Sequence, residues 1–108
     1  MTMAQYIDLD KHPVDVRLAA HTIGLDHKRP YYRHGKLWYR PYRNYFDTHD
    51  RSLDHDIWHK SLIPCGYAAI NDQRKREDGI TLITYNLTRK GLDWLGSALN
   101  VNIHDEED

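Results

Sequence analysis

The sequence predicts a small α+β domain, on three observations. A chain of 108 residues is long enough for one domain with a single core. Its composition, 40% hydrophobic and 29% charged, is that of a globular protein rather than a disordered one. Segments with helical periodicity alternate with short segments that are rich in strand-forming residues. We therefore expect one globular domain over residues 1–103, followed by a disordered acidic tail over 104–108.

The first half of the chain is predicted to form one helix and one hairpin. Residues 13–24 are predicted to be helical because a proline is tolerated in the first turn and Gly24 is a stop signal. Apolar residues lie on both sides of this helix, so we expect it to be largely buried. Residues 30–46 are predicted to form an aromatic-rich β-hairpin that turns at His34-Gly35. Its second strand should lie at an edge or end at Pro41.

The second half is predicted to contain two helices around a second hairpin. A helix over 52–66 starts at Ser52, a residue type that caps helices, and stops near Gly66. A strand over 67–70, a polar loop over 71–79 and a strand over 80–87 follow. The third helix, over 89–99, is capped by Thr88 and has an apolar stripe of Leu92, Leu95 and Leu99. Residues 101–104 add a short closing strand.

Positive charge is concentrated in one segment. The net charge is −1, yet residues 28–46 carry six Lys or Arg residues, seven aromatic residues and no acid. Interleaved cations neutralise phosphates, and an aromatic ring can stack on a base for about 1–3 kcal/mol. The segment therefore predicts a nucleic-acid-binding surface. Its candidate contact residues are Arg29, Tyr32, Arg33, Lys36, Trp38, Arg40, Tyr42 and Arg43.

Only about half of these aromatic side chains can face a partner if the segment folds as a hairpin. We expect strand alternation to place Tyr31, Arg33, Leu37 and Tyr39 on one face, and Tyr32, Lys36, Trp38 and Arg40 on the other. Leu37 and either Trp38 or Tyr39 are expected in the core. Two other interpretations stay open. Trp, Tyr and Arg also dominate protein–protein interfaces, and Arg that covers an aromatic ring can serve packing alone.

Residues 62–95, LIPCGYAAINDQRKREDGITLITYNLTRKGLDWL, resemble the end of the recognition helix and the wing of winged-helix regulators of the MarR type. Leu62 and Gly66 match the turn after the helix, 71–79 the wing loop, and 87–91 the Leu-Thr-x-x-Gly motif that opens the next helix. The resemblance implies that Arg74, Lys75 and Arg76 contact the DNA backbone or minor groove from the wing tip. Asp72, Glu77 and Asp78 offset those three charges.

The resemblance does not extend to the helices before the wing. A helix-turn-helix needs two helices joined by a short turn. Residues 25–51 instead hold the aromatic-basic segment where the first of those helices would lie. The helix predicted at 52–66 is also acidic at its N-terminal end, the part that would enter the major groove. We therefore expect a contact surface for nucleic acid rather than a sequence-specific repressor.

One short segment has an enzyme-like pattern. His55 and His59 have the i, i+4 spacing with which two imidazoles bind zinc from one helical face, and His49 is close in sequence. The acid that follows His55 is aspartate, where the zincin motif has glutamate. In the alternative interpretation, both histidines lie exposed on the polar side of the helix, away from Leu53 and Ile57. We expect no bound metal and no cofactor.

The sequence as a whole predicts a small, non-enzymatic accessory or regulatory protein that binds DNA, RNA or a nucleoprotein complex. Its style is similar to that of small bacteriophage or mobile-element proteins. The alternatives are a protein-interaction module, such as a phage inhibitor of a host protein, and a zinc-dependent hydrolase; a homodimer stays open. We expect a cytoplasmic protein, because its single cysteine, Cys65, cannot form an internal disulfide and the first residues lack the pattern of a secretory signal. No run of about 18 apolar residues predicts a membrane span.

Overall fold

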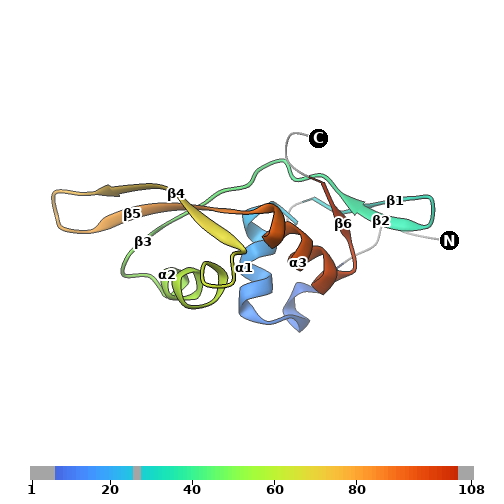
Figure 1. Cartoon of the computed structure of the whole chain (residues 1–108), viewed down its shortest axis with the longest axis horizontal. Helices are drawn as coiled ribbons and strands as arrows, with labels where there is room; N and C mark the ends of the chain where they lie inside the picture. The colour runs from blue at the N-terminus through green and yellow to red at the C-terminus, as the bar shows by residue number, and fades with distance from the viewer. Residues whose placement is uncertain (1–6, 26–27, 105–108) are drawn as a thin grey trace.

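The elements follow the predicted order of helix, hairpin, helix, hairpin and helix, with two further strands. A computed structural model describes residues 7–25 and 28–104 and confirms the α+β class. Within these residues, three α-helices lie in the middle of an elongated molecule of 55 × 29 × 23 Å, and the two hairpins extend from opposite ends (Figure 1). None of the described helices has the length and apolar character that crossing a membrane requires.

The first sheet consists of β1 (Tyr31–Arg33), β2 (Lys36–Tyr39) and β6 (Asn102–Ile103), in the order β1-β2-β6. His34 and Gly35 form the predicted tight turn, and both have positive φ, at 55° and 77°. The predicted extent of the hairpin, to residue 46, is wrong. Pairing ends at Tyr39, and Pro41, which has no N–H to donate, lies in the segment that leaves the sheet.

The second sheet consists of β3 (Phe46–His49), β5 (Thr81–Leu87) and β4 (Ala68–Lys75), with β5 in the centre. Strand β3 was not predicted. The polar loop predicted over 71–79 is also wrong, because β4 continues to Lys75, which pairs with Thr81, after a register shift between Ile70 and Asp72. Both strands escape pattern analysis because backbone pairing needs no apolar alternation where side chains face water.

The helices begin where their caps predict. Helix α1 spans Val14–Thr22, α2 spans Leu53–Ile57 and continues as a π-helical turn, η2 (Trp58–Leu62), and α3 spans Arg89–Leu99. A short 3₁₀ turn, η1 (Leu9–Lys11), precedes α1. The hydroxyl oxygens of Ser52 and Thr88 accept hydrogen bonds from the backbone N–H groups of His55 and Gly91, at 3.1 and 3.0 Å. Helix α1 is largely buried, as expected, but Val14 at its start is 49% exposed.

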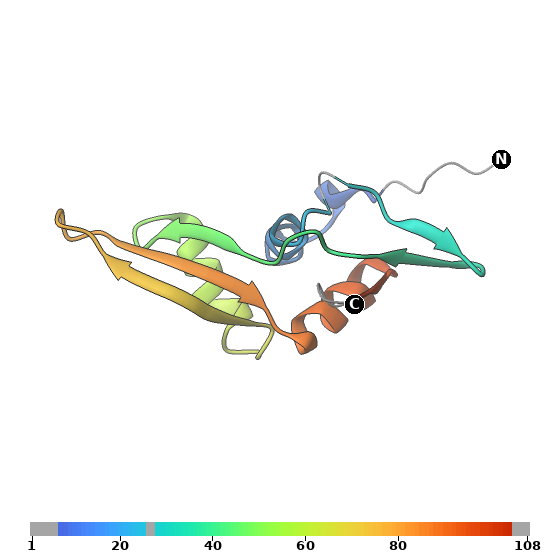
Figure 2. The same cartoon turned by 90° about the horizontal axis from the view of Figure 1, so that it is seen from above.

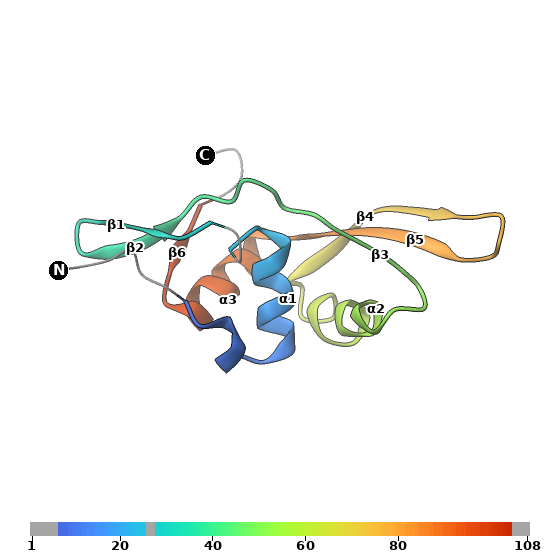
Figure 3. The ribbon, with the colours of Figure 1, turned by 180° about the vertical axis from the view of Figure 1, so that it is seen from behind.

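The core lies between the helices and the bases of both hairpins. The predicted stripe of α3 is confirmed, because Leu92, Leu95 and Leu99 are all buried. The helices gather on one side of the strands, and residues 40–45 cross the other side from β2 to β3 (Figures 1 and 3). Seen from above, the two hairpins extend in opposite directions from the ends of this crossing segment (Figure 2).

Candidate nucleic-acid interface

The hairpin β1–β2 brings three of the predicted contact residues to one face, together with Tyr31, which was not among them. Its two-residue turn pairs Tyr31 with Trp38 and Arg33 with Lys36. Directly opposed residues of an antiparallel pair lie on the same face of a sheet. The predicted division into faces is therefore wrong, because it did not allow for the register that the turn imposes. One face carries Tyr31, Arg33, Lys36 and Trp38, which we call the cationic face; the other carries Tyr32 and Leu37.

The aromatic rings of the cationic face are held in place by the C-terminal strand. Trp38 is half-buried, and its ring stacks on the ring of His104 with centroids 5.1 Å apart and planes inclined by 21°. Tyr31 Oη lies at hydrogen-bond distance, 3.2 Å, from His104 Nε2. The backbone N–H of His104 also donates to the Tyr39 carbonyl at 2.9 Å, so the folded part extends to this first residue of the predicted tail. Residues 105–108 lie outside the described part.

The cations of the cationic face, and Arg40 just after β2, have no acidic partner among the described residues. Within residues 7–25 and 28–104, no carboxylate forms an ion pair with Arg33, Lys36 or Arg40, and all three are exposed. Arg33 and Lys36 are directly opposed across the hairpin. Like charges in that arrangement destabilise a β-hairpin. No described carboxylate offsets the repulsion between these two side chains, so the arrangement suits an anionic ligand.

The cations of the second hairpin are largely neutralised by their neighbours. Arg74 Nε lies 3.5 Å from an Asp72 oxygen, and Arg76 is hydrogen-bonded to Asp78 at 2.5 Å. The hydrogen bond from the Ile80 N–H, and then the Arg76 charge, hold the pKa of Asp78 below its usual value. Lys75 is exposed near the end of β4. The wing tip implied by the MarR-type resemblance therefore offers an anion much less unpaired charge than the cationic face does.

Tyr42 extends the aromatic-basic surface onto the crossing segment. Lys28 Nζ lies 4.9 Å from the centroid of its ring, and the ring is 45% exposed. The ring sits against Gly24, where any added Cβ would overlap Tyr42 atoms. Arg43 has a different role, because its guanidinium donates to the His21 carbonyl at 2.6 Å and so fastens the segment to the end of α1. Arg29 is exposed at the start of the same surface.

An asparagine that the sequence analysis did not single out joins the two halves of the molecule. Asn44 Nδ2 donates to the Leu87 carbonyl at 3.0 Å, and Asn44 Oδ1 accepts from the Leu87 N–H at 2.9 Å. The side chain thus forms, at the C-terminal end of β5, the two hydrogen bonds that a backbone residue of a neighbouring strand would form. No local pattern singles this residue out, because Asn is common in loops and β3, which follows it, was not predicted.

The two helical histidines are partly buried, and His59 contacts the second sheet through Tyr85. Trp58 and His59 pack against Tyr85 of β5, and Trp58 and Leu62 are fully buried, while His55 is half-buried one turn before His59. Leu53, which was expected on the apolar side, is 83% exposed. The exposed placement of His55 and His59 is therefore wrong, because the fully buried Trp58 and Leu62 fix the rotation of the helix and bring both imidazoles inward.

The histidines form a stacked pair that ends on a buried tyrosine. The rings of His55 and His59 have centroids 4.2 Å apart, and His59 Nε2 is hydrogen-bonded to Tyr85 Oη at 3.0 Å. Burial, then the neighbouring His55, lowers the pKa of His59, although Asp56 opposes this. Burial, then the charge of Asp50, raises the pKa of Tyr85 to about 12.

This arrangement favours a neutral imidazole against an un-ionised phenol, which is a packing role. His49 lies on β3 and is exposed. Among the residues that the structure describes, no three His, Cys, Asp or Glu side chains are grouped so that they could hold a metal ion. The zinc-hydrolase alternative therefore has no three-ligand site in the described part of the chain.

Between β3 and β4 lies one continuous helical stretch. Residues 50–67 are all described, and α2 runs directly into η2 without the turn that separates the two helices of a helix-turn-helix. Comparison with known proteins finds no matching family model, no matching curated protein and no matching solved structure. The function has to follow from the chemistry of the surface itself.

Proposed function

We propose that the protein binds nucleic acid through the cationic face and the adjoining surface of Lys28 and Tyr42, as a non-enzymatic accessory or regulatory protein. The observation that carries this proposal is the opposed pair Arg33 and Lys36. Two like charges face each other at a hairpin tip, with no acid among the described residues to pair with them. A phosphate that reaches both cations converts a repulsive pair into a binding site.

The surrounding side chains suit the rest of a nucleotide. Tyr31 is 41% exposed on the same face as the two cations, and Trp38 is directly opposite Tyr31 across the hairpin. Aromatic rings stack on bases with little dependence on base identity, while cations follow the phosphate backbone. Because the described residues between β3 and β4 form one helical stretch and not the two helices of a helix-turn-helix, we infer that the protein follows the backbone and does not read sequence. The exposed free thiol of Cys65 fits a reducing, cytoplasmic location.

Binding of the wild-type protein to labelled oligonucleotides tests this proposal. Fluorescence anisotropy would be measured with single-stranded and duplex DNA and RNA, at low salt and at about 0.15 M salt. We expect binding at low salt that weakens as salt rises, because each neutralised phosphate releases a condensed counterion.

The matched variant removes only the opposed pair. Arg33→Ala/Lys36→Ala should weaken binding at low salt and leave the fold unchanged by circular dichroism, since both side chains are exposed. If none of the four nucleic acids binds at low salt, the proposal is wrong. The aromatic-arginine surface would then be a contact for a protein partner.

A further inference from the structure

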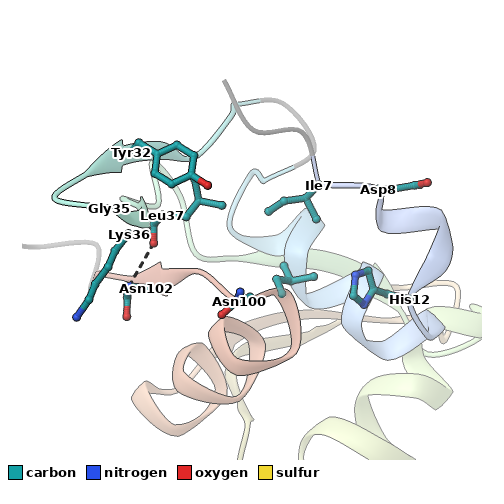
Figure 4. A pocket seen from close by; sticks show the side chains of 10 residues that line it. Ile7, Asp8, His12, Tyr32, Gly35, Lys36, Leu37, Asn100 and Asn102 are labelled. Atoms are coloured by element: carbon teal, nitrogen blue, oxygen red, sulfur yellow. Dashed lines mark hydrogen bonds between the residues drawn. The ribbon is translucent and has the colours of Figure 1, made fainter. Parts of the chain in front are cut away.

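A pocket lies beside the short hairpin, next to Tyr32 and Leu37 of the face opposite to the cationic face. It has a volume of about 570 Å³ and opens between the β1–β2 hairpin, η1 and the end of α3 (Figure 4). Its lining residues include Ile7, Asp8, Tyr32, Leu37, Asn100 and Asn102. Tyr32 and Leu37 form one side, Ile7 lies across from them, and Asn100 lies at the base (Figure 4).

The walls of this pocket suit a flat ring and its base suits a polar edge. The Tyr32 ring is 52% exposed, although it stands above partly buried apolar side chains. Asn102 Nδ2 donates to the Leu37 carbonyl at 3.3 Å, which fixes the orientation of that amide (Figure 4). Asn100 is held in a left-handed conformation, with φ of 59°, where α3 ends. Each amide group has both hydrogen-bond donors and acceptors.

Lys36 connects the pocket to the cationic face. Lys36 is among the residues that line the pocket, although its side chain points away from Ile7 (Figure 4), and its backbone position is directly opposite Arg33 at the hairpin tip. A phosphate bound at Arg33 and Lys36 would therefore hold the next nucleotide at the mouth of the pocket. The combination of an aromatic wall, amide groups at the base and a cation at the rim matches the chemistry of a nucleotide.

We propose that this pocket receives an unpaired nucleobase, with Tyr32 against its ring and Asn100 at its polar edge, so that the ligand is single-stranded nucleic acid. This inference rests on the proposed function, since the cationic face supplies the phosphate contact. A duplex binds less well, because a base must first leave its partner and its stack, which costs a few kcal/mol.

Two oligonucleotides that differ only in their bases separate the pocket from the cationic face. One is a single-stranded homopolymer, and the other has the same length and phosphates with abasic sites along its middle. The full-length protein should bind the first about tenfold more tightly at low salt, which corresponds to the contribution of one stacked base. Tyr32→Ala should reduce this ratio towards one, whereas Tyr45→Ala, which removes a comparably exposed tyrosine outside the pocket, should leave it unchanged.

A second variant, at a different position of the pocket, distinguishes the loss of a pocket contact from misfolding of Tyr32→Ala. Asn100→Gly keeps a residue that adopts positive φ readily and removes the side chain with its amide, so it should also lower the ratio. Equal affinity for the two oligonucleotides, with salt dependence retained, would overturn the pocket inference and leave the proposed function standing. Absence of binding to both at low salt would remove the proposed function and this inference with it.

Discussion

The two hairpins at opposite ends of this protein differ in length, burial and charge. Strands β4 and β5 have eight and seven residues, and β5 sends Ile83, Tyr85 and Leu87 into the core. Strands β1 and β2 have three and four residues, and Tyr39 is the one buried side chain among their described residues. The longer hairpin carries acids that pair with its arginines, whereas the shorter hairpin has none.

This difference separates a structural hairpin from a binding hairpin. Side chains of β5 that are fully buried contribute folding free energy, and charges near them are neutralised locally. The cations of β1–β2 add nothing to the core, and their mutual repulsion opposes folding slightly. Variants of the longer hairpin should therefore change the free energy of unfolding, while variants of the shorter one should change binding.

The largest expected effect on stability lies at the base of the longer hairpin. Any Cβ at Gly91 would overlap the carbonyl oxygen of Tyr67, just before β4, and a backbone group cannot move aside easily. Gly91→Ala should lower the free energy of unfolding by about 3 kcal/mol or more. At the two hairpin tips, Gly35 and Gly79 have open space around them and positive φ, so Gly35→Ala and Gly79→Ala should each cost about 1–2 kcal/mol. Urea unfolding measures the free energy of unfolding of all three variants. Equal losses in the three would contradict the expectation that the backbone contact at Gly91 matters most.

The next effect should appear at alkaline pH. Burial raises the pKa of Tyr85 to about 12 from 10.0, so the unfolded chain ionises first and stability is lost as pH rises from about 10 towards 12. Because a pKa change of one corresponds to about 1.4 kcal/mol, the wild type should lose about 3 kcal/mol across that range. Tyr85→Phe should flatten the profile in this window, whereas Tyr32→Phe in the shorter hairpin should follow the wild type. Unfolding curves in urea at several pH values measure the slope, and an unchanged slope in Tyr85→Phe would count against the buried phenol.

A smaller effect is expected where the crossing segment joins the longer hairpin. Asn44→Ala removes the donor and acceptor that meet the Leu87 backbone, and Asn86 Nδ2 still donates to the Leu87 carbonyl at 3.2 Å. We expect a loss of about 1–2 kcal/mol, mostly from the unpaired Leu87 N–H. Hydrogen exchange should show faster exchange at that amide. Asn71→Ala, at an exposed position of β4, is the control and should leave both stability and exchange unchanged.

The elements with strong local signals could be predicted from the sequence. Ser52 and Thr88 cap their helices as predicted, and the turn at His34-Gly35 forms because Gly tolerates positive φ. Strand β3 and the outer half of β4 could not be predicted, since their stability comes from pairing with β5 across many residues of chain. Local patterns do not contain that pairing.

The sequence predicted most residues of the candidate site but not how they are arranged on the hairpin. The sequence singled out Arg33, Lys36 and Trp38, yet it placed Trp38 and Arg33 on different faces because the hairpin register was not considered. The stacking of His104 on Trp38 joins residues that are far apart in the sequence, and no local signal shows such a contact. The same holds for the pocket beside Tyr32, which forms only when η1 and α3 meet the hairpin.

The most direct test compares equal charge losses in the two hairpins. Affinity for one single-stranded oligonucleotide would be measured over a range of salt for the wild type, Arg33→Ala/Lys36→Ala and Arg74→Ala/Arg76→Ala. The slope of log affinity against log salt should become shallower by about two for the first variant, and should not change for the second, whose arginines are already paired. Equal changes in both variants, or a change only in the second, would contradict the assignment of binding to the shorter hairpin.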